Sequence, residues 1–212
     1  ALLYAFVAMD IVPKGVKKLI KRREGESAKY LEQNAVIRQE LDEKNLPITS
    51  ISRYLERFGN YPVYQNTEVS YFPIGEEFLK DLLVEIERAE KFIFMEYFIV
   101  YEGKMWNTLK EALSKKAKQG VDVRLLVDGM CAINQLPRSF PEKMKALGID
   151  TRVFMPVMPV FSTYQNNRDH RKIFVIDGKI AYNGGINIAD EYINARALYG
   201  HWKDTAVKLC GD

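Results

Sequence analysis

Two side chains that can bind and react with phosphate stand two residues apart, His170 and Lys172, at the start of the apolar run 173–176. In a β-strand, residues two apart point to the same face and lie about 6.5 Å apart along the backbone. An imidazole and an ammonium at that separation can hold one phosphate group between them. Asp177 is an odd number of residues from both, so a regular strand turns it to the opposite face.

The residues that follow make this pattern more specific. Gly178 comes directly after the aspartate, and Gly184, Gly185 and Asn187 lie a few residues beyond. A His-x-Lys-x-x-x-x-Asp spacing joined to a Gly-Gly-x-Asn run resembles the motif of the phospholipase D superfamily. The resemblance implies phosphodiester chemistry that passes through an active-site histidine.

Other segments resemble bacterial cardiolipin synthases, and the resemblance covers roughly residues 46–212. These segments are residues 71–75, 94–99, 167–172, 189–194 and 200–205. The resemblance implies a lipid phosphatidyltransferase with two such motifs in one chain. This sequence has two histidines in total, His170 and His201, and no second complete motif. We therefore expect half of a two-motif enzyme, inactive by itself.

The resemblance also implies roles for the motif residues. His170 would be the nucleophile on phosphorus or the general acid, and imidazole suits both because its pKa lies near neutrality. Lys172 would neutralise phosphate oxygens whose charge grows in the transition state. Asn187 would donate to the same oxygens, and Gly184 and Gly185 would allow a tight, bulge-like backbone that lets it reach them.

A carboxylate is expected to orient the imidazole of His170 through its far nitrogen, as in other histidine-based sites. Asp204 is the first candidate, because the family's supporting acid sits on the strand after this motif. Glu96, in an apolar strand, is the second candidate and a substrate-binding residue; a buried ion pair, for example with Arg124, is its structural alternative. Asp177 is expected to be structural, either capping the amides of its own turn or pairing with a basic group.

No metal ion and no cofactor are expected. His170 and His201 lack the spacing of metal ligands, and Lys172 already supplies the cation that Mg²⁺ would otherwise provide. Cys131 and Cys210 are far apart and show no metal-type spacing, so they are interpreted as reduced thiols.

The start of the chain has the composition of a membrane-proximal segment. Nine apolar residues, 1–9, are too few to cross a bilayer, and residues 14–23 contain six basic and no acidic side chains. We interpret 1–45 as the end of a transmembrane helix, a basic juxtamembrane stretch and a connecting helix over 25–45, on the cytoplasmic side of a bacterial membrane. A buried helical turn and a solvated basic face are the alternatives.

The rest of the chain, 46–212, alternates between helical and strand patterns, which predicts an α/β layered domain with a mixed or parallel sheet flanked by helices. Helices are expected over 48–58, 76–90, 105–119, 141–147 and 188–193, and strands over 92–100, 121–127, 151–154, 172–176, 180–183 and 204–209. The run 92–100 suggests a strand covered on both faces. Asp177 and Gly178 form a strong turn signal between two of the strands, which indicates a hairpin.

Together these features favour a phosphatidyltransferase that joins two phosphatidylglycerol molecules and releases glycerol through a phosphohistidine intermediate. Its expected partners are phosphatidylglycerol, anionic membrane lipid and a second motif-bearing half, in a missing C-terminal part or a dimer mate. The net charge of +3 gives no reason to expect nucleic acid. The alternatives are a phospholipase D or nuclease-type hydrolase built as a homodimer of single-motif chains, and a non-catalytic membrane-binding module.

Overall fold

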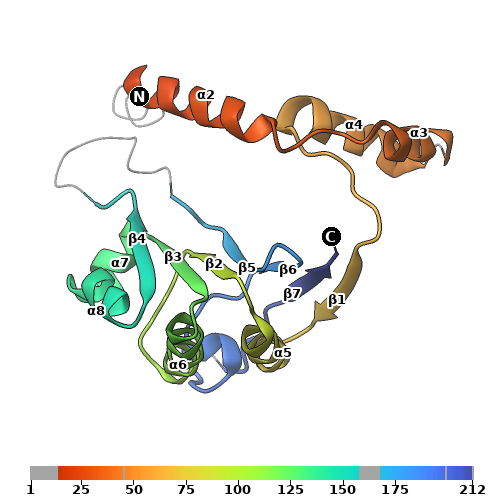
Figure 1. Cartoon of the computed structure of the whole chain (residues 1–212). Coiled ribbons are helices and arrows are strands. Elements are labelled where there is room, and N and C mark those ends of the chain that lie inside the picture. The colour runs from red at the N-terminus through yellow and green to blue at the C-terminus, as the bar shows by residue number, and fades with distance from the viewer. Residues whose placement is uncertain (1–13, 45, 158–167, 199, 212) are drawn as a thin grey trace, which may run out of the picture. The chain divides into compact units, whose positions relative to one another are not determined.

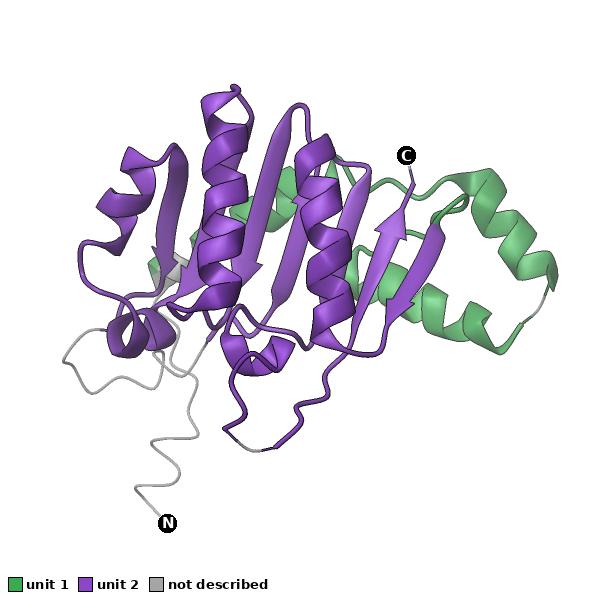
Figure 2. Cartoon of the chain, turned by 90° about the horizontal axis from the view of Figure 1, so that it is seen from below, with its two compact units in different colours: residues 1–67 green, residues 68–212 purple. Residues whose placement is uncertain are grey.

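The computed structural model describes residues 14–44, 46–157, 168–198 and 200–211. The chain divides into two compact units, residues 1–67 and 68–212 (Figure 2). The expected domain boundary, at residue 45, falls inside the first unit. The proposed end of a transmembrane helix, residues 1–9, lies outside the described residues. Across the described part of the chain, no helix is both long enough and apolar enough to cross a bilayer.

Three helices make up the described part of the first unit: α2 (Lys14–Ala28), α3 (Ala35–Lys44) and α4 (Pro47–Gly59). The prediction of one connecting helix over 25–45 was wrong. Asn34 starts a separate helix there, because its side-chain oxygen accepts the backbone N–H groups of Val36 and Ile37, at 2.9 and 3.3 Å. The prediction of a helix over 48–58 is confirmed by α4, which begins at Pro47 and is capped at its C-terminus by Asn60 in the left-handed conformation.

The second unit is an α/β layered domain built on one seven-stranded sheet (Figure 1). The strands are β1 (Glu68–Phe72), β2 (Phe92–Tyr97), β3 (Asp122–Asp128), β4 (Ile149–Phe154), β5 (Lys172–Ile176), β6 (Ile180–Gly184) and β7 (Ala206–Cys210). Their order is β1-β7-β6-β5-β2-β3-β4. The pairs β2–β3 and β3–β4 are parallel and the other four are antiparallel, so the sheet is mixed, as predicted.

Helices α5 (Gly75–Arg88) and α6 (Lys104–Lys118) pack side by side under one face of this sheet (Figure 1). Each has a buried apolar stripe at helical spacing, which is why the sequence predicted both. The stripes are Phe78, Leu82 and Ile86 in α5, and Met105, Trp106, Leu109 and Leu113 in α6. The shorter elements are α7 (Gly129–Gln135), α8 (Phe140–Ala146) and the 3₁₀ helix η2 (Asp190–Ile193).

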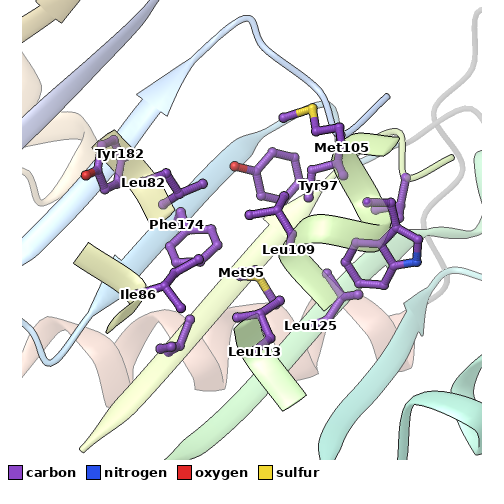
Figure 3. Close-up of a cluster of buried hydrophobic side chains, with 14 of the residues drawn as sticks. Leu82, Ile86, Met95, Tyr97, Met105, Leu109, Leu113, Leu125, Phe174 and Tyr182 are labelled. Carbon is purple, nitrogen blue, oxygen red and sulfur yellow. The ribbon is translucent and has the colours of Figure 1, made fainter. Parts of the chain in front are cut away.

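The core of the domain lies between these two helices and the sheet (Figure 3). In β2, Ile93, Met95 and Tyr97 point into it, while the alternate residues on the other face are only half-buried. The interpretation of β2 as a strand covered on both faces was therefore wrong within the described residues. The sequence also gave no prediction of β1 or α7.

Candidate active site

The structure brings the side chains of His170 and Lys172 into contact. The Lys172 ammonium lies 3.3 Å from Nδ1 of His170 and donates a 2.6 Å hydrogen bond to the His170 carbonyl oxygen. His170 does not lie within β5, as the parity argument assumed, but two residues before the strand begins at Lys172. The lysine is buried and the imidazole is exposed, so a ligand can reach the ring while the cation stays fixed below it.

Phe98, in the loop after β2, lies against this pair, and no sequence pattern predicted its position. Its ring centroid lies 4.5 Å from that of His170, and the Lys172 Nζ atom lies 5.2 Å from the same centroid. An aromatic face attracts a nearby cation through its quadrupole. Phe98 therefore positions both groups and covers one side of them with an apolar surface.

The charge of Lys172 is set by burial and by acidic neighbours. Burial lowers the pKa of Lys172, while the carboxylates of Asp204 and Asp169 act in the opposite direction. A partly desolvated ammonium interacts strongly with an incoming anion because little water screens it. This is the property a phosphate-binding cation needs.

Asn187 is buried, and its side chain makes two hydrogen bonds within the fold. Its Oδ1 accepts the backbone N–H of Ile99 at 3.0 Å, and its Nδ2 donates to the hydroxyl of Tyr192 at 2.8 Å. These bonds join the loop after β2 to η2, next to the bridge between Val100 and Ile188. One amide hydrogen of Asn187 is therefore already used.

Gly184 and Gly185 lie where a side chain would collide with neighbouring atoms. Neither has a positive φ. A Cβ on Gly184 would lie 2.3 Å from the carbonyl oxygen of Thr205, and one on Gly185 would lie 2.1 Å from Oδ1 of Asp204. These glycines therefore let the start of β7 and the loop before it pack closely against β6, and their bulge-like role stays a prediction.

Asp204 lies in the loop before β7, because that strand begins at Ala206 rather than at 204 as predicted. Its Oδ1 accepts the backbone N–H of Thr205 at 2.8 Å. Within the described residues, no hydrogen bond joins Asp204 to His170. The carboxylate lies close enough to Lys172 to act on its charge, so in this geometry it supports the lysine.

Glu96 faces away from Lys172, because β2 places Glu96 opposite Ile173 and Tyr97 opposite Lys172. Its carboxylate forms a 2.6 Å ion pair with Arg171. An ion pair was the structural alternative expected for Glu96, and one is present, but its partner is Arg171. The arginine given as an example, Arg124, pairs instead with Asp122 at 2.6 Å. The parity of the strand places Glu96 and Arg171 on the same face.

The pKa of Glu96 is raised to about 7, first by burial and then by the neighbouring carboxylate of Asp169, against the influence of Arg171. Asp169 itself bonds Arg171, from the arginine Nε to Oδ1 at 3.0 Å. Glu96, Asp169 and Arg171 lie on the face of the sheet opposite Lys172. Their contacts fix the segment that leads into His170.

Asp128, at the end of β3, also holds that segment, and it was not a candidate in the sequence analysis. It is buried; its Oδ2 accepts the backbone N–H of Asp169 at 3.0 Å, and its Oδ1 accepts that of Met130 at 2.8 Å. The one signal for it was an acid directly before Gly129, after an apolar strand, where it caps α7. Asp128 thus fixes the position of the residue next to His170.

Asp177 has a different task from the rest of the motif. Its carboxylate accepts the backbone N–H groups of Glu90, Lys91 and Phe92, each at 2.8 Å. Burial acts against its charge, but these three donors together lower the pKa of Asp177. It was expected to cap its own turn or to pair with a base; instead it secures the start of β2, away from His170.

His201 and Lys203 repeat the two-residue spacing of His170 and Lys172. They differ in two respects: both are exposed in the loop before β7, and Lys208 stands where an aspartate would complete the motif. The spacing here therefore carries no second motif.

Comparison with known proteins places this site in a family. The family described as cardiolipin synthase, PLD-like domain, matches residues 82–197. A cardiolipin synthase of Geobacillus kaustophilus is 37% identical over 161 residues, which are 76% of this chain and 32% of that protein. An uncharacterised protein of Streptococcus mutans is 44% identical over 197 residues, 93% of this chain and 43% of that protein. The chain thus spans less than half the length of these relatives.

Solved structures share the fold at low sequence identity. NucT from Helicobacter pylori superimposes with a TM-score of 0.51 and 14% identity, over 68% of this chain and 86% of that one. Phosphatidylserine synthase of Haemophilus influenzae superimposes with a TM-score of 0.53 and 18% identity, over 68% of this chain and 33% of that one. The family match covers more than half of the residues of this chain. The chain therefore belongs to the cardiolipin synthase family of phospholipase D-like domains.

Proposed function

We propose that this chain is one half of a phosphatidyltransferase that makes cardiolipin from two phosphatidylglycerol molecules and releases glycerol. The observation that carries the proposal is the buried Lys172 ammonium 3.3 Å from the exposed imidazole of His170. This pair offers a reactive nitrogen and a fixed positive charge to the same phosphate. Family membership supports the choice of a phospholipid as the substrate.

The reaction needs two imidazoles. One attacks the phosphorus of phosphatidylglycerol, so that an N–P bond forms, the P–O bond to glycerol breaks, and the glycerol oxygen takes a proton from the other imidazole. The terminal hydroxyl of a second phosphatidylglycerol then gives its proton to that imidazole and attacks the phosphohistidine. Cardiolipin leaves and both rings return to their starting states. His170 supplies one ring, and a second motif-bearing half supplies the other.

The neighbouring residues have roles that follow from their contacts. Lys172 would exchange its bonds to His170 for phosphate oxygens, where its charge stabilises the transition state. Asn187 would offer them its second amide hydrogen. Asp204 would hold the lysine charged near phosphate, and Glu96 would orient the segment before His170 through Arg171. No metal ion or cofactor enters these steps.

The enzyme would work at the bacterial cytoplasmic membrane, with this domain on the cytoplasmic side. The support for this is the basic stretch 14–23, because lysines and arginines next to a bilayer attract anionic lipid at roughly 1 kcal/mol per charge. Phosphatidylglycerol is itself anionic, so the same charges would concentrate the substrate.

The test is transfer of labelled phosphatidylglycerol in detergent micelles by the full-length protein. His170→Ala should abolish cardiolipin formation, because no nearby side chain replaces an imidazole. Cys131→Ala, a change next to Lys172 that removes no proposed group, should leave it near normal. Cardiolipin formation that persists in His170→Ala would refute the phosphohistidine mechanism, and activity that vanishes on chelation would refute its independence of metal.

The single-motif alternative is tested with residues 1–212 alone. A verified monomer should be inactive, since the missing acid–base group is worth about 10²–10⁴ in rate. Robust turnover by the monomer would contradict the half-enzyme proposal. Turnover by a dimer, with phosphatidic acid or cleaved nucleic acid as the product, would instead establish a homodimeric hydrolase.

A further inference from the structure

Helix α4 packs within its own unit through its polar side. Thr49 and Ser52 are its buried residues; the Thr49 hydroxyl donates to the carbonyl oxygen of Leu41 at 3.2 Å. Arg38 of α3 donates to the Ser52 hydroxyl at 2.9 Å and forms an ion pair with Glu56 at 2.5 Å. A helix of a globular domain normally buries its apolar side and exposes its polar side. In α4 this arrangement is reversed.

The apolar side of α4 is consequently exposed. Its five large apolar residues fall on one stripe at helical spacing, which we name the α4 apolar stripe: Ile48, Ile51, Tyr54, Leu55 and Phe58, exposed by 51%, 55%, 63%, 44% and 68%. Two of the rings contact each other, with centroids 4.8 Å apart. Five large apolar residues in a single stripe are more than the scattered exposure that is normal for a protein surface.

The charges of the unit that carries the α4 apolar stripe indicate the chemistry of what could cover it. Exposed basic side chains are concentrated on α2: Lys17, Lys18, Lys21, Arg22 and Arg23. On α4 itself, Arg57 lies next to the stripe, with its guanidinium carbon 5.5 Å from the centre of the Phe58 ring, whereas Arg53 pairs with Asp42 at 3.0 Å. An apolar stripe on a unit rich in exposed basic residues complements a surface that is anionic at its outer layer and apolar beneath it. An anionic bilayer has that layering.

We infer that the α4 apolar stripe inserts into the surface layer of an anionic lipid bilayer, with α4 parallel to the membrane plane. Aliphatic side chains enter the acyl boundary, and tyrosine rings suit the headgroup level because they have an apolar body and a polar tip. This docking surface goes beyond the proposed function, on which it rests only in placing the enzyme at a membrane. It would hold the protein at its lipid substrate independently of any membrane-spanning segment.

The first experiment measures binding of residues 1–212 to vesicles of equal parts phosphatidylglycerol and phosphatidylcholine. The double variant Ile51→Ser, Phe58→Ser should lose at least about tenfold in partition coefficient, because it removes two inserting side chains. The matched control is Val69→Ser, Tyr71→Ser on β1, which removes side chains of similar exposure, 63% and 61%, outside the stripe. The control should bind within about twofold of the original chain.

The second experiment locates α4 in the bilayer. In a chain carrying Cys131→Ala and Cys210→Ala, an environment-sensitive fluorophore is attached at Ile51→Cys or at Ser50→Cys, the adjacent exposed residue outside the stripe. Emission should shift to the blue on vesicles with phosphatidylglycerol at Ile51→Cys and much less at Ser50→Cys. Vesicles of phosphatidylcholine alone should give a weak shift at both positions.

Equal vesicle binding by the stripe variant and the original chain would overturn the inference, and so would equal fluorescence shifts at the two labelled positions. A third outcome that overturns it is a stripe variant that elutes as a monomer while the original chain elutes as a dimer, because a second copy would then cover the stripe. Circular dichroism checks that the variants are folded. Binding needs no turnover, so a full-length protein that docks through the stripe but makes no cardiolipin would contradict the proposed function alone.

Discussion

The two units of this chain bury different kinds of side chains. Every buried hydrophobic residue among the described ones belongs to residues 68–212, from Phe72 to Ala206. In the first unit the buried residues are Thr49 and Ser52, both polar, and α3 buries none. The comparison teaches that the second unit has its own core, whereas the helices of the first unit are joined by hydrogen bonds and ion pairs and leave their apolar side chains exposed.

The largest expected effect is on the free energy of unfolding, when a phenylalanine is replaced by alanine in each unit. Phe174→Ala removes a fully buried ring from the core under the sheet and should lower the free energy of unfolding by about 3–5 kcal/mol. Phe58→Ala, on the exposed α4 apolar stripe, should change it by less than about 0.5 kcal/mol. Urea unfolding followed by circular dichroism measures both. Similar losses for the two variants would show that the first unit has a core as well.

A second contrast sets a buried lysine against an exposed one. In the full-length protein, Lys172→Ala should reduce phosphatidyl transfer by about 3–4 kcal/mol of transition-state stabilisation, mostly in kcat, because a fixed charge is lost at the phosphate. Lys21→Ala, on α2, should leave kcat unchanged because five other basic residues surround it. Steady-state kinetics in mixed micelles gives both values. A loss confined to KM in Lys172→Ala would mean that the lysine only binds substrate.

A third contrast concerns carboxylates that hold structure. Asp177→Asn should lower the free energy of unfolding by about 1–2 kcal/mol at neutral pH, because three backbone donors lose a charged acceptor. Asp42→Asn, at a surface ion pair with Arg53, should have little effect. Since the folded pKa of Asp177 is lowered, its contribution is present above the unfolded value of about 3.9 and is lost as the pH falls through the folded pKa.

Because this contribution is lost in acid, the difference in the free energy of unfolding between Asp177→Asn and the original chain should close as the pH falls. Denaturant titrations at pH 7 and near pH 3 measure it. A gap that stays constant over this range would mean that the charge of Asp177 is not what stabilises the start of β2.

The smallest expected effect is a change in pH dependence. The pKa of Glu96 is about 7 in the folded chain against an ordinary value of 4.5, so the folded state binds more protons between these values. Its ionisation therefore costs stability as the pH rises from 4.5 toward 7. Glu96→Gln lacks this cost, and its stability relative to the original chain should rise over that interval. Unfolding free energies at several pH values test this, and a relative stability that falls with pH would contradict it.

Local patterns predicted most of the elements but not their partners. The stripes of α5 and α6 and the turn at Asp177 and Gly178 are encoded within a few neighbouring residues, so the helices and the hairpin β5–β6 could be read from the sequence. Strand β1 was missed because it is a short edge strand whose burial comes at one residue, Phe72, and whose pairing depends on β7.

Within the site, the contact of His170 with Lys172 followed from their spacing, whereas the positions of their supports did not. Whether Glu96 meets Arg171 or Arg124 depends on the register between β2 and β5, strands about eighty residues apart, and no local pattern encodes it. Phe98 follows β2 and Asp128 ends β3. Their contacts with the motif also depend on how the strands pair, so no local pattern predicted them. The supporting role of Asp204 toward His170 remains a prediction, since its described hydrogen bond is to Thr205.

The pairing of β1 with β7 has a consequence for synthesis. The first strand of the domain, Glu68–Phe72, forms its ladder with Ala206–Cys210, the last one. While the ribosome makes the chain, the parallel strands β2, β3 and β4 can assemble early, but β1 has to wait until the last strand has emerged. Closing so long a loop is slow, and an unpaired strand can meanwhile pair with other chains. The nascent domain therefore passes through an interval in which β1 has no partner strand, and this interval ends when β7 forms.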